Sequence, residues 1–147
     1  MLFLPKQNFN MKFKYSICHP LKKNIEYINH PITKYEVLKI VENYPWKEKL
    51  ELQANSNNDD IYYSPSLNFL NIENNRSFEL TANFDKKNNI EFSLWYNRPI
   101  NRKILGFIKV KNRMTVSDIW DINYDKSLYY LKLFLNGSYE QVEELYR

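Results

Sequence analysis

The stretch SFELTANFDKKNNIEFSLWY, Ser77 to Tyr96, decides the fold because it encodes both strands of one hairpin. Apolar and polar residues alternate on either side of the polar segment DKKNN, which is the pattern of strands with one buried face. A turn centred on Lys87 pairs the apolar residues with one another: Phe84 with Ile90, Ala82 with Phe92, Leu80 with Leu94 and Phe78 with Tyr96. Because a shift of one residue would turn every side chain over, this agreement predicts an antiparallel pair in this register.

The next segment, NRPINRK, has the composition of a second turn. A reversal centred on Ile100 continues the same inner face into KILGFIKV, pairing Tyr96 with Ile104, Leu94 with Gly106, Phe92 with Ile108 and Ile90 with Val110. Upstream, LELQA from Leu50 and the segment IYYSPSLNFLNI also have a period of two and are predicted as strands. The short polar connections favour an antiparallel meander.

Helices are predicted before and after this sheet in the chain. In HPITKYEVLKIVENYPW, Thr33 and Glu36 have the spacing of a capping box, and Pro45 ends the helix. Near the C-terminus, Asp125 is expected to cap a helix through SLYYLKLFL, and Ser138 opens a short last helix. The segment TVSDIWDI between sheet and tail fits either a helical turn or an extended strand.

These elements predict an α+β fold with an N-terminal helix, an antiparallel meander sheet of four to five strands, and C-terminal helices packed on one sheet face. With 147 residues, the chain is expected to form a single domain, 1–147, that buries enough surface for a hydrophobic core. Met11 is an alternative start, in which case residues 1–10 are an extension.

Trp95 falls on the polar side of its strand, away from its inward-facing neighbours Leu94 and Tyr96. The second hairpin would place Leu105 and Phe107 near it as an apolar island. Basic residues would form the rim of this island: Arg98, Arg102, Lys109 and Lys111. Residues 97–113 contain six Lys or Arg and no acid, in a chain of net charge +4. Three readings stay open: a second layer of the chain covers the island, the island is open and binds a partner, or the predicted register is wrong.

An open island of this kind has two candidate partners. Trp95 and the basic rim suit an acidic patch on a protein, with Arg98 and Arg102 as hydrogen-bond donors and the two lysines steering association. The same residues suit single-stranded nucleic acid, where bases stack on rings and phosphates contact Lys and Arg. Nucleic acid is the second choice, because residues 25–96 contain eleven acids and the Gly-aromatic RNA-binding signature is missing from the sequence.

The sequence gives little support for catalysis, a cofactor or a metal site. Cys18 and His19 are adjacent, but neighbours on an extended chain point to opposite faces, so the dipeptide by itself makes no catalytic pair. Asp118, Asp121 and Asp125 would be caps and solvated charges more often than metal ligands. We therefore expect a non-enzymatic protein. One cysteine, and no apolar run approaching ~20 residues, predict a cytoplasmic protein without a membrane span.

The order of segments resembles that of small bacterial immunity proteins of polymorphic-toxin and contact-dependent growth-inhibition systems. The resemblance covers HPITKYEVLKIVENYPW, YYSPSLNFLNIENNRSFELTANF, IEFSLWYNRP and LKLFLNGSYEQVEEL, and so most of the chain from Met11. It implies a stoichiometric inhibitor that docks on a toxin in the cytosol and has no catalytic residues. Many immunity proteins against nucleases are acidic, whereas this chain is basic. The resemblance therefore implies a toxin with an acidic contact surface, or contact away from a nucleic-acid groove.

Overall fold

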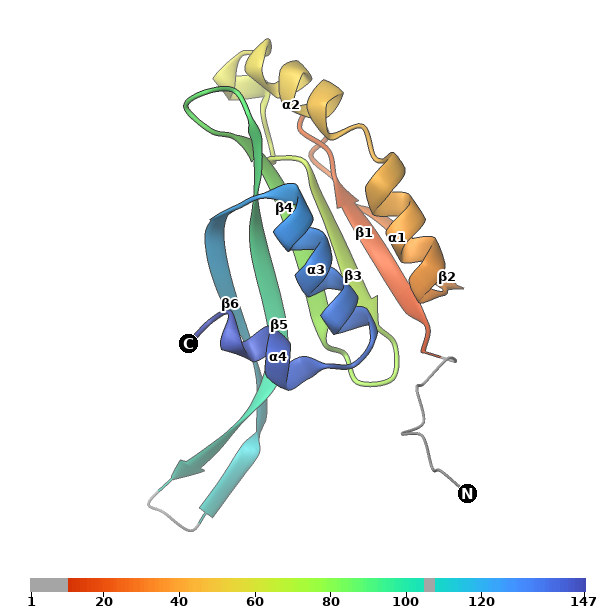
Figure 1. Cartoon of the computed structure of the whole chain (residues 1–147), viewed down its shortest axis with the longest axis vertical. Coiled ribbons are helices and arrows are strands. Elements are labelled where there is room, and N and C mark those ends of the chain that lie inside the picture. The colour runs from red at the N-terminus through yellow and green to blue at the C-terminus, as the bar shows by residue number, and fades with distance from the viewer. Residues whose placement is uncertain (1–10, 105–107) are drawn as a thin grey trace.

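A computed structural model of the protein describes the backbone of residues 11–104 and 108–147 and the side chains of residues 11–100 and 113–147. Strands and helices follow one another in this order: β1 (Phe13–Cys18), β2 (Glu26–Ile32), α1 (Lys34–Asn43), α2 (Trp46–Ala54), the short 3-10 helix η1 (Asn58–Asp60), β3 (Ser66–Asn71), β4 (Ser77–Phe84), β5 (Ile90–Ile104), β6 (Ile108–Ile122), α3 (Tyr124–Leu135) and α4 (Tyr139–Glu144). The fold is α+β, as the sequence predicts (Figure 1).

The strands form one antiparallel sheet in the order β2-β1-β3-β4-β5-β6. Two details of the predicted fold are wrong. The sheet has six strands rather than four to five, and no helix opens the described chain, because β1 and β2 precede α1. The missed strands are β1 and β2. FKYSIC does alternate between apolar and polar residues, a signal that the sequence prediction did not use, whereas EYINHPI has no regular alternation and contains a proline.

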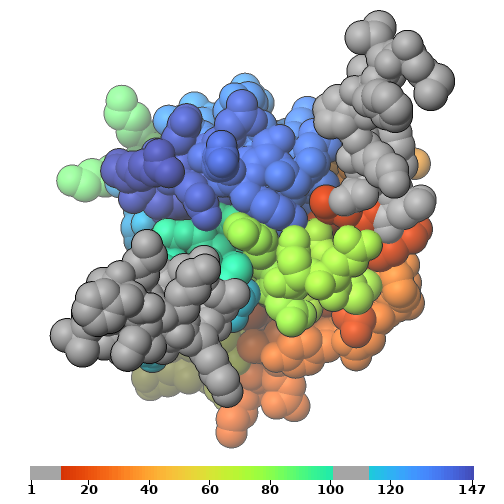
Figure 2. Space-filling view, turned by 90° about the horizontal axis from the view of Figure 1, so that it is seen from below, coloured from red at the N-terminus to blue at the C-terminus, as the bar shows by residue number. Residues whose placement is uncertain are grey.

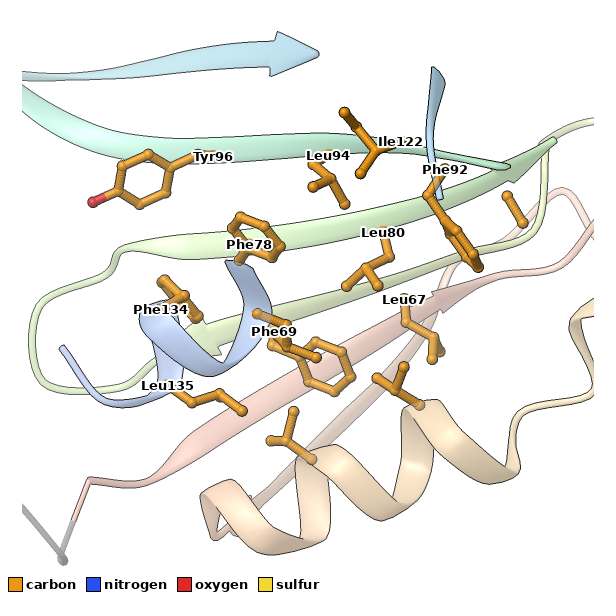
Figure 3. Close-up of a cluster of buried hydrophobic side chains, with 14 of the residues drawn as sticks. Leu67, Phe69, Phe78, Leu80, Phe92, Leu94, Tyr96, Ile122, Phe134 and Leu135 are labelled. Carbon is orange, nitrogen blue, oxygen red and sulfur yellow. The ribbon is translucent and has the colours of Figure 1, made fainter. Parts of the chain in front are cut away.

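The hydrophobic core lies between one face of the sheet and the helices (Figure 3). Figure 1 shows α1, α2 and α3 on the same side of the strands, with α4 beside the lower part of β5. Rings dominate this interior: Phe134 of α3 lies 5.6 Å from Phe78 and 6.2 Å from Tyr96, measured between ring centroids. Aromatic pairs at such distances contribute about 0.5–1.5 kcal/mol beyond their buried area.

The sequence predicts α1 correctly but predicts part of α2 as a strand. Thr33 caps α1 as predicted, since its side chain accepts from the Glu36 backbone N–H while the Glu36 side chain accepts from the Thr33 backbone N–H. The segment LELQA from Leu50, predicted as a strand, is helical and belongs to α2. Trp46 and Leu50 are both buried and stand four residues apart, so helical burial overrides the short alternation.

The hairpin formed by β4 and the first part of β5 has the predicted register. Phe84 pairs with Ile90 and Phe78 with Tyr96, with the intervening pairs also as predicted. The second predicted register is wrong: β5 continues through NRPINRK, and the chain reverses between Ile104 and Ile108. Consequently Tyr96 pairs with Ser117 rather than with Ile104. The segment TVSDIWDI, which the sequence left open, is part of strand β6.

The C-terminal helices pack on one sheet face, and both lie where they were predicted. Asn123 caps α3 in place of Asp125, because its side-chain oxygen accepts from the backbone N–H of Lys126 at 2.8 Å. α4 begins after Ser138, whose side chain makes no capping hydrogen bond. None of the described helices is long and apolar enough to cross a membrane.

Candidate functional site

The face of the sheet opposite the helices carries one cross-strand row of residues that runs through all six strands. The pairings Tyr27–Ser16, Ser16–Asn68, Asn68–Glu79, Glu79–Trp95 and Trp95–Asp118 connect the row from β2 to β6. We call this side of the sheet the Trp95 face. Trp95 is thus on the opposite side from Leu94 and Tyr96, as the sequence predicts, and it is partly buried.

A groove lies across the Trp95 face. All six strands contribute to its lining, which consists of Ser16, Cys18, Ile25, Tyr27, Asn68, Ser77, Glu79, Trp95, Asn97 and Val116. Its volume is about 260 Å³. In a flat sheet of six strands spaced about 4.8 Å apart, the two edges would lie roughly 24 Å from each other. A groove of this size that meets both β2 and β6 therefore requires the face to be concave.

The curvature comes from β2, whose N-terminal end bends toward the Trp95 face. The pairing of β1 with β2 is irregular between Phe13 and Tyr15, where one residue of β1 stands opposite three of β2. Figure 2 looks from below and shows α3 and α4 in blue on one side of the sheet, with the orange of the β2 region on the opposite side. The helices cover one face, and β2 curls along the border of the other.

Strand β6 adds exposed apolar residues to one side of the groove. Val116 is 56% exposed, Trp120 is 54% exposed and Met114 is 38% exposed. Trp120 packs edge-on against Trp95, with 5.8 Å between ring centroids, and its indole N–H donates to Asp118 at 2.6 Å. Because β6 is an edge strand, these side chains lie beside a sheet edge that pairs with no strand of the described chain.

Three polar atoms that β5 directs to this face have no hydrogen-bond partner among the described residues. Ser93 Oγ, Trp95 Nε1 and Asn97 Oδ1 are each buried without a partner among the described side chains and backbone. The three residues occupy consecutive same-face positions of one strand. Buried polar groups in folded proteins are nearly always paired, so three unpartnered atoms at successive positions of one strand are unusual.

The groove also holds two groups whose ionisation is unfavourable. Burial raises the pKa of Glu79 above that of an ordinary glutamate. Burial, with the neighbouring Glu79 carboxyl as a second cause, raises the pKa of Cys18 to about 11. The Cys18 thiol is therefore protonated at neutral pH and is a poor nucleophile.

The structure does not bring the predicted apolar island together. Asp118, rather than Leu105, is the neighbour of Trp95 on β6, and Lys109 pairs with Lys103 rather than lying opposite Glu91. Leu105 and Phe107 lie outside the described residues. Arg102, Lys109 and Lys111 belong to β5 and β6 as strand residues, but their side chains are outside the described part of the chain, so their predicted role in binding stays a prediction.

Arg98 lies on the opposite side of the sheet from Trp95. It is part of strand β5 rather than a loop, and its side chain donates to Ser117 Oγ at 2.8 Å. Its guanidinium also lies 3.6 Å from the carboxylate of Glu143 on α4 and over the ring of Tyr96. These contacts hold α4 against the sheet. Partner binding by Arg98, which the sequence predicted, remains a prediction.

The adjacent Cys18 and His19 have different surroundings. His19 Nε2 lies 2.7 Å from a Glu26 carboxylate oxygen, and Lys49 Nζ lies 3.3 Å from His19 Nδ1. Both ring nitrogens thus face partners other than the thiol. Among residues 11–100 and 113–147, no group of three or more His, Cys, Asp or Glu side chains is arranged to hold a metal ion.

Sequence reasoning missed Tyr27, Val116 and Trp120 on this face. The signal for the last two was weak, because VSDIWD from Val116 to Asp121 does not alternate; only the spacing of four residues between Val116 and Trp120 is compatible with one face of a strand. Because the predicted turn at NRPINRK made KILGFIKV the partner of β5, the segment from Val116 was left without a predicted strand to pair with. Comparisons of this chain with protein-family models, curated proteins and solved structures found no match.

Proposed function

We propose that this chain is a non-enzymatic binding protein that docks its partner on the Trp95 face. The observation that carries the proposal is the series of buried, unpartnered polar atoms on β5, at Ser93, Trp95 and Asn97. A buried polar group without a hydrogen bond costs about 1–3 kcal/mol. A partner laid over this stretch would satisfy these groups, and that gain would contribute directly to binding.

The apolar residues around the groove supply the rest of a docking surface. Val116, Trp120 and Met114 are exposed next to Trp95. Exposed apolar residues gathered in one place mark interaction sites, and tryptophan is among the residues that contribute most to binding energy. Their position along the edge strand β6 lets a partner contact them together with the groove.

The charges divide the proposed interface into two parts. At the groove, Glu79 and Asp118 flank Trp95, which favours a neutral or positively charged surface of the partner. Segment 97–113 contains six Lys or Arg and no acid, and it suits the acidic contact surface expected from the sequence. Figure 1 shows the β5–β6 hairpin extending past the ends of the other strands, so a partner could meet the hairpin and the groove at separate points.

We propose further that the partner is a bacterial toxin and that this chain is its immunity protein. The support for this class is the resemblance in segment order to small immunity proteins, together with the docking face described above. In this proposal the protein acts in the cytoplasm of the toxin-producing cell. It binds the toxin in a one-to-one complex and blocks its active site or another essential surface.

A growth-rescue assay tests this function. The chain is co-expressed with a candidate toxin domain, which would be sought at the C-terminus of any large secreted protein encoded next to it, and growth is measured. Wild type should restore growth, whereas Val116→Arg should fail, because a bulky cation at an exposed position of the docking face obstructs binding without removing core packing. Tyr129→Arg, at a 55% exposed position of α3 on the helix side, is the matched control and should rescue. Rescue by both variants, or by neither, contradicts the proposal.

Nucleic-acid binding is the second candidate function, and segment 97–113 is the observation that favours it. A basic two-stranded ribbon has the charge that phosphates require. Fluorescence anisotropy with a labelled single-stranded RNA tests this alternative. A steep loss of affinity between 50 and 200 mM salt, about 300-fold if six phosphates of the single strand are neutralised, would support it. Failure to bind at low salt would remove it.

A further inference from the structure

The groove on the Trp95 face contains a carboxyl group whose charge is not balanced. Glu79 makes no hydrogen bond or ion pair with any residue whose side chain is described. Its neighbour on the other side of Trp95, Asp118, is also acidic and accepts a hydrogen bond from Trp120. Lys14 is a basic residue on the same face. It pairs with Leu70 of β3, which pairs with Ser77 of β4, so Lys14 is not in the same cross-strand row as Glu79. The groove is therefore locally acidic.

The unpartnered atoms beside Glu79 also favour a ligand with several donors. Asn97 Oδ1 is an acceptor that lines the groove, and Ser93 Oγ can accept as well as donate. Trp95 presents an aromatic ring directly opposite Glu79 on the neighbouring strand, where Cβ atoms stand about 4.5–5.5 Å apart. A planar cation with several N–H groups would meet the carboxylate, the amide oxygen and the ring in one place.

We propose that this groove binds an arginine side chain of the protein partner, with its guanidinium against Glu79 and stacked on the ring of Trp95. The inference rests on the docking face proposed above and specifies what enters it. Guanidinium is preferred to the ammonium of lysine because it is planar, carries five donors, is more weakly hydrated and stacks on aromatic rings. A volume of about 260 Å³ equals that of roughly eight to nine water molecules at ~30 Å³ each, which is enough for one long side chain.

The indole N–H of Trp95 requires an acceptor, which guanidinium does not provide. A main-chain carbonyl of the partner segment that carries the arginine would supply it. Burial raises the pKa of Glu79 because the buried carboxylate loses its interaction with water. A cation placed against the carboxylate would replace that lost interaction, so the direction of the pKa shift is consistent with this occupant.

The test uses N-acetyl-arginine methylamide as the probe and the indole N–H signals of the protein as the readout in ¹H–¹⁵N NMR. The chain has three tryptophans, so each signal is assignable with single Trp→Phe variants. The probe should shift the Trp95 signal in a saturable way, with an affinity in the millimolar range. The signal of Trp46, which is 6% exposed and bonded to the Val41 carbonyl, should not move. N-acetyl-citrulline methylamide, a neutral analogue of the same shape, should bind at least about tenfold more weakly.

The matched variants are Glu79→Gln and Glu73→Gln, the latter at an exposed position of the turn between β3 and β4. Glu79→Gln should weaken the arginine probe about tenfold or more, and Glu73→Gln should leave its affinity unchanged. Equal binding of the citrulline probe, equal binding to Glu79→Gln, or no saturable shift at Trp95 would overturn the inference. The docking proposal is tested separately. It is wrong if Val116→Arg still binds the toxin domain, whatever result the two small-molecule probes give.

Discussion

Trp95 on β5 lies directly opposite Glu79 on β4, and both line the same groove on the face of the sheet that the helices leave uncovered. A largely buried carboxyl with no partner and a buried indole N–H with no acceptor both reduce stability. Such departures from the usual pairing of polar groups are expected where a surface is built for binding. This single cross-strand pair therefore connects the stability of the protein to its proposed function.

Replacing Glu79 with glutamine should stabilise the protein at neutral pH. Burial raises the pKa of Glu79 above its ordinary value, so the folded state holds the proton more tightly than the unfolded state. The stabilising contribution of this group is fully present below the pKa of the unfolded state and is lost as pH rises through the pKa of the folded state. At pH 7 the Glu79→Gln variant should therefore show a higher melting temperature than the wild type; in a domain of this size, each 1 kcal/mol of added stability raises the melting temperature by about 2–4 °C.

Thermal melts at pH 7 and near pH 4 measure this effect. The gain of Glu79→Gln should shrink at the lower pH, where the wild-type carboxyl is itself protonated. Glu73→Gln serves as control and should show no pH-dependent difference from wild type. A destabilised Glu79→Gln variant at pH 7 would mean that the carboxylate has a favourable partner after all.

Replacing Arg98 with alanine should destabilise the protein. Its guanidinium donates to Ser117 and lies near Glu143, and hydrogen bonds to charged groups contribute about 1.5–3 kcal/mol. Urea unfolding measures the loss, with Lys126→Ala, at an exposed position of α3, as control. A variant with wild-type stability and weaker partner binding would assign Arg98 to the interface instead, as the sequence alone suggested.

Cys18 should react slowly with alkylating reagents. Its pKa of about 11 leaves a much smaller thiolate fraction at pH 7.5 than a free cysteine has, by roughly two orders of magnitude. The rate of modification by iodoacetamide, followed by mass spectrometry, should therefore be low in the folded protein. It should rise to that of free cysteine in denaturant. Fast alkylation of the folded protein would show that the thiol is activated and would reopen a catalytic role for Cys18 and His19.

The capping box of α1 should contribute measurably to stability. Thr33→Ala removes the side-chain acceptor for the Glu36 backbone N–H and should lower the free energy of unfolding by ~1 kcal/mol. Thr33→Ser keeps the acceptor and should lose much less. Urea denaturation of both variants decides this, and equal stability of the two would contradict the assignment of the cap.

The sequence correctly predicts those parts of the fold for which two separate sequence signals agree. The hairpin from Ser77 to Tyr96 combines alternation with a polar turn, and a slip of one residue would bury its charges. The helix after Thr33 combines a capping box with helical spacing. By contrast, LELQA is too short for its alternation to outweigh the burial of Trp46 and Leu50 on one side of a helix.

The site was predictable only in part, because residue contacts on the outer face depend on where β5 turns. Trp95 and its neighbour Glu79 follow from the first hairpin alone. Pro99 and the asparagines of NRPINRK have turn chemistry, yet they lie in a strand that pairs with β6. The pairing of β5 with β4 ends at Asn97, so one side of β5 pairs with no described strand at Pro99, and a proline is tolerated there. The curl of β2 over the groove has no local sequence signal, because it arises from the irregular pairing with β1.

The most direct test of the docking face is a titration of the protein with its toxin domain, followed through the three indole N–H signals. Trp95 and Trp120 lie on the proposed face, whereas Trp46 is in the core and donates to the Val41 carbonyl. We predict that the signals of Trp95 and Trp120 shift to saturation at one equivalent while that of Trp46 stays in place. Binding that leaves Trp95 and Trp120 unshifted would contradict the account.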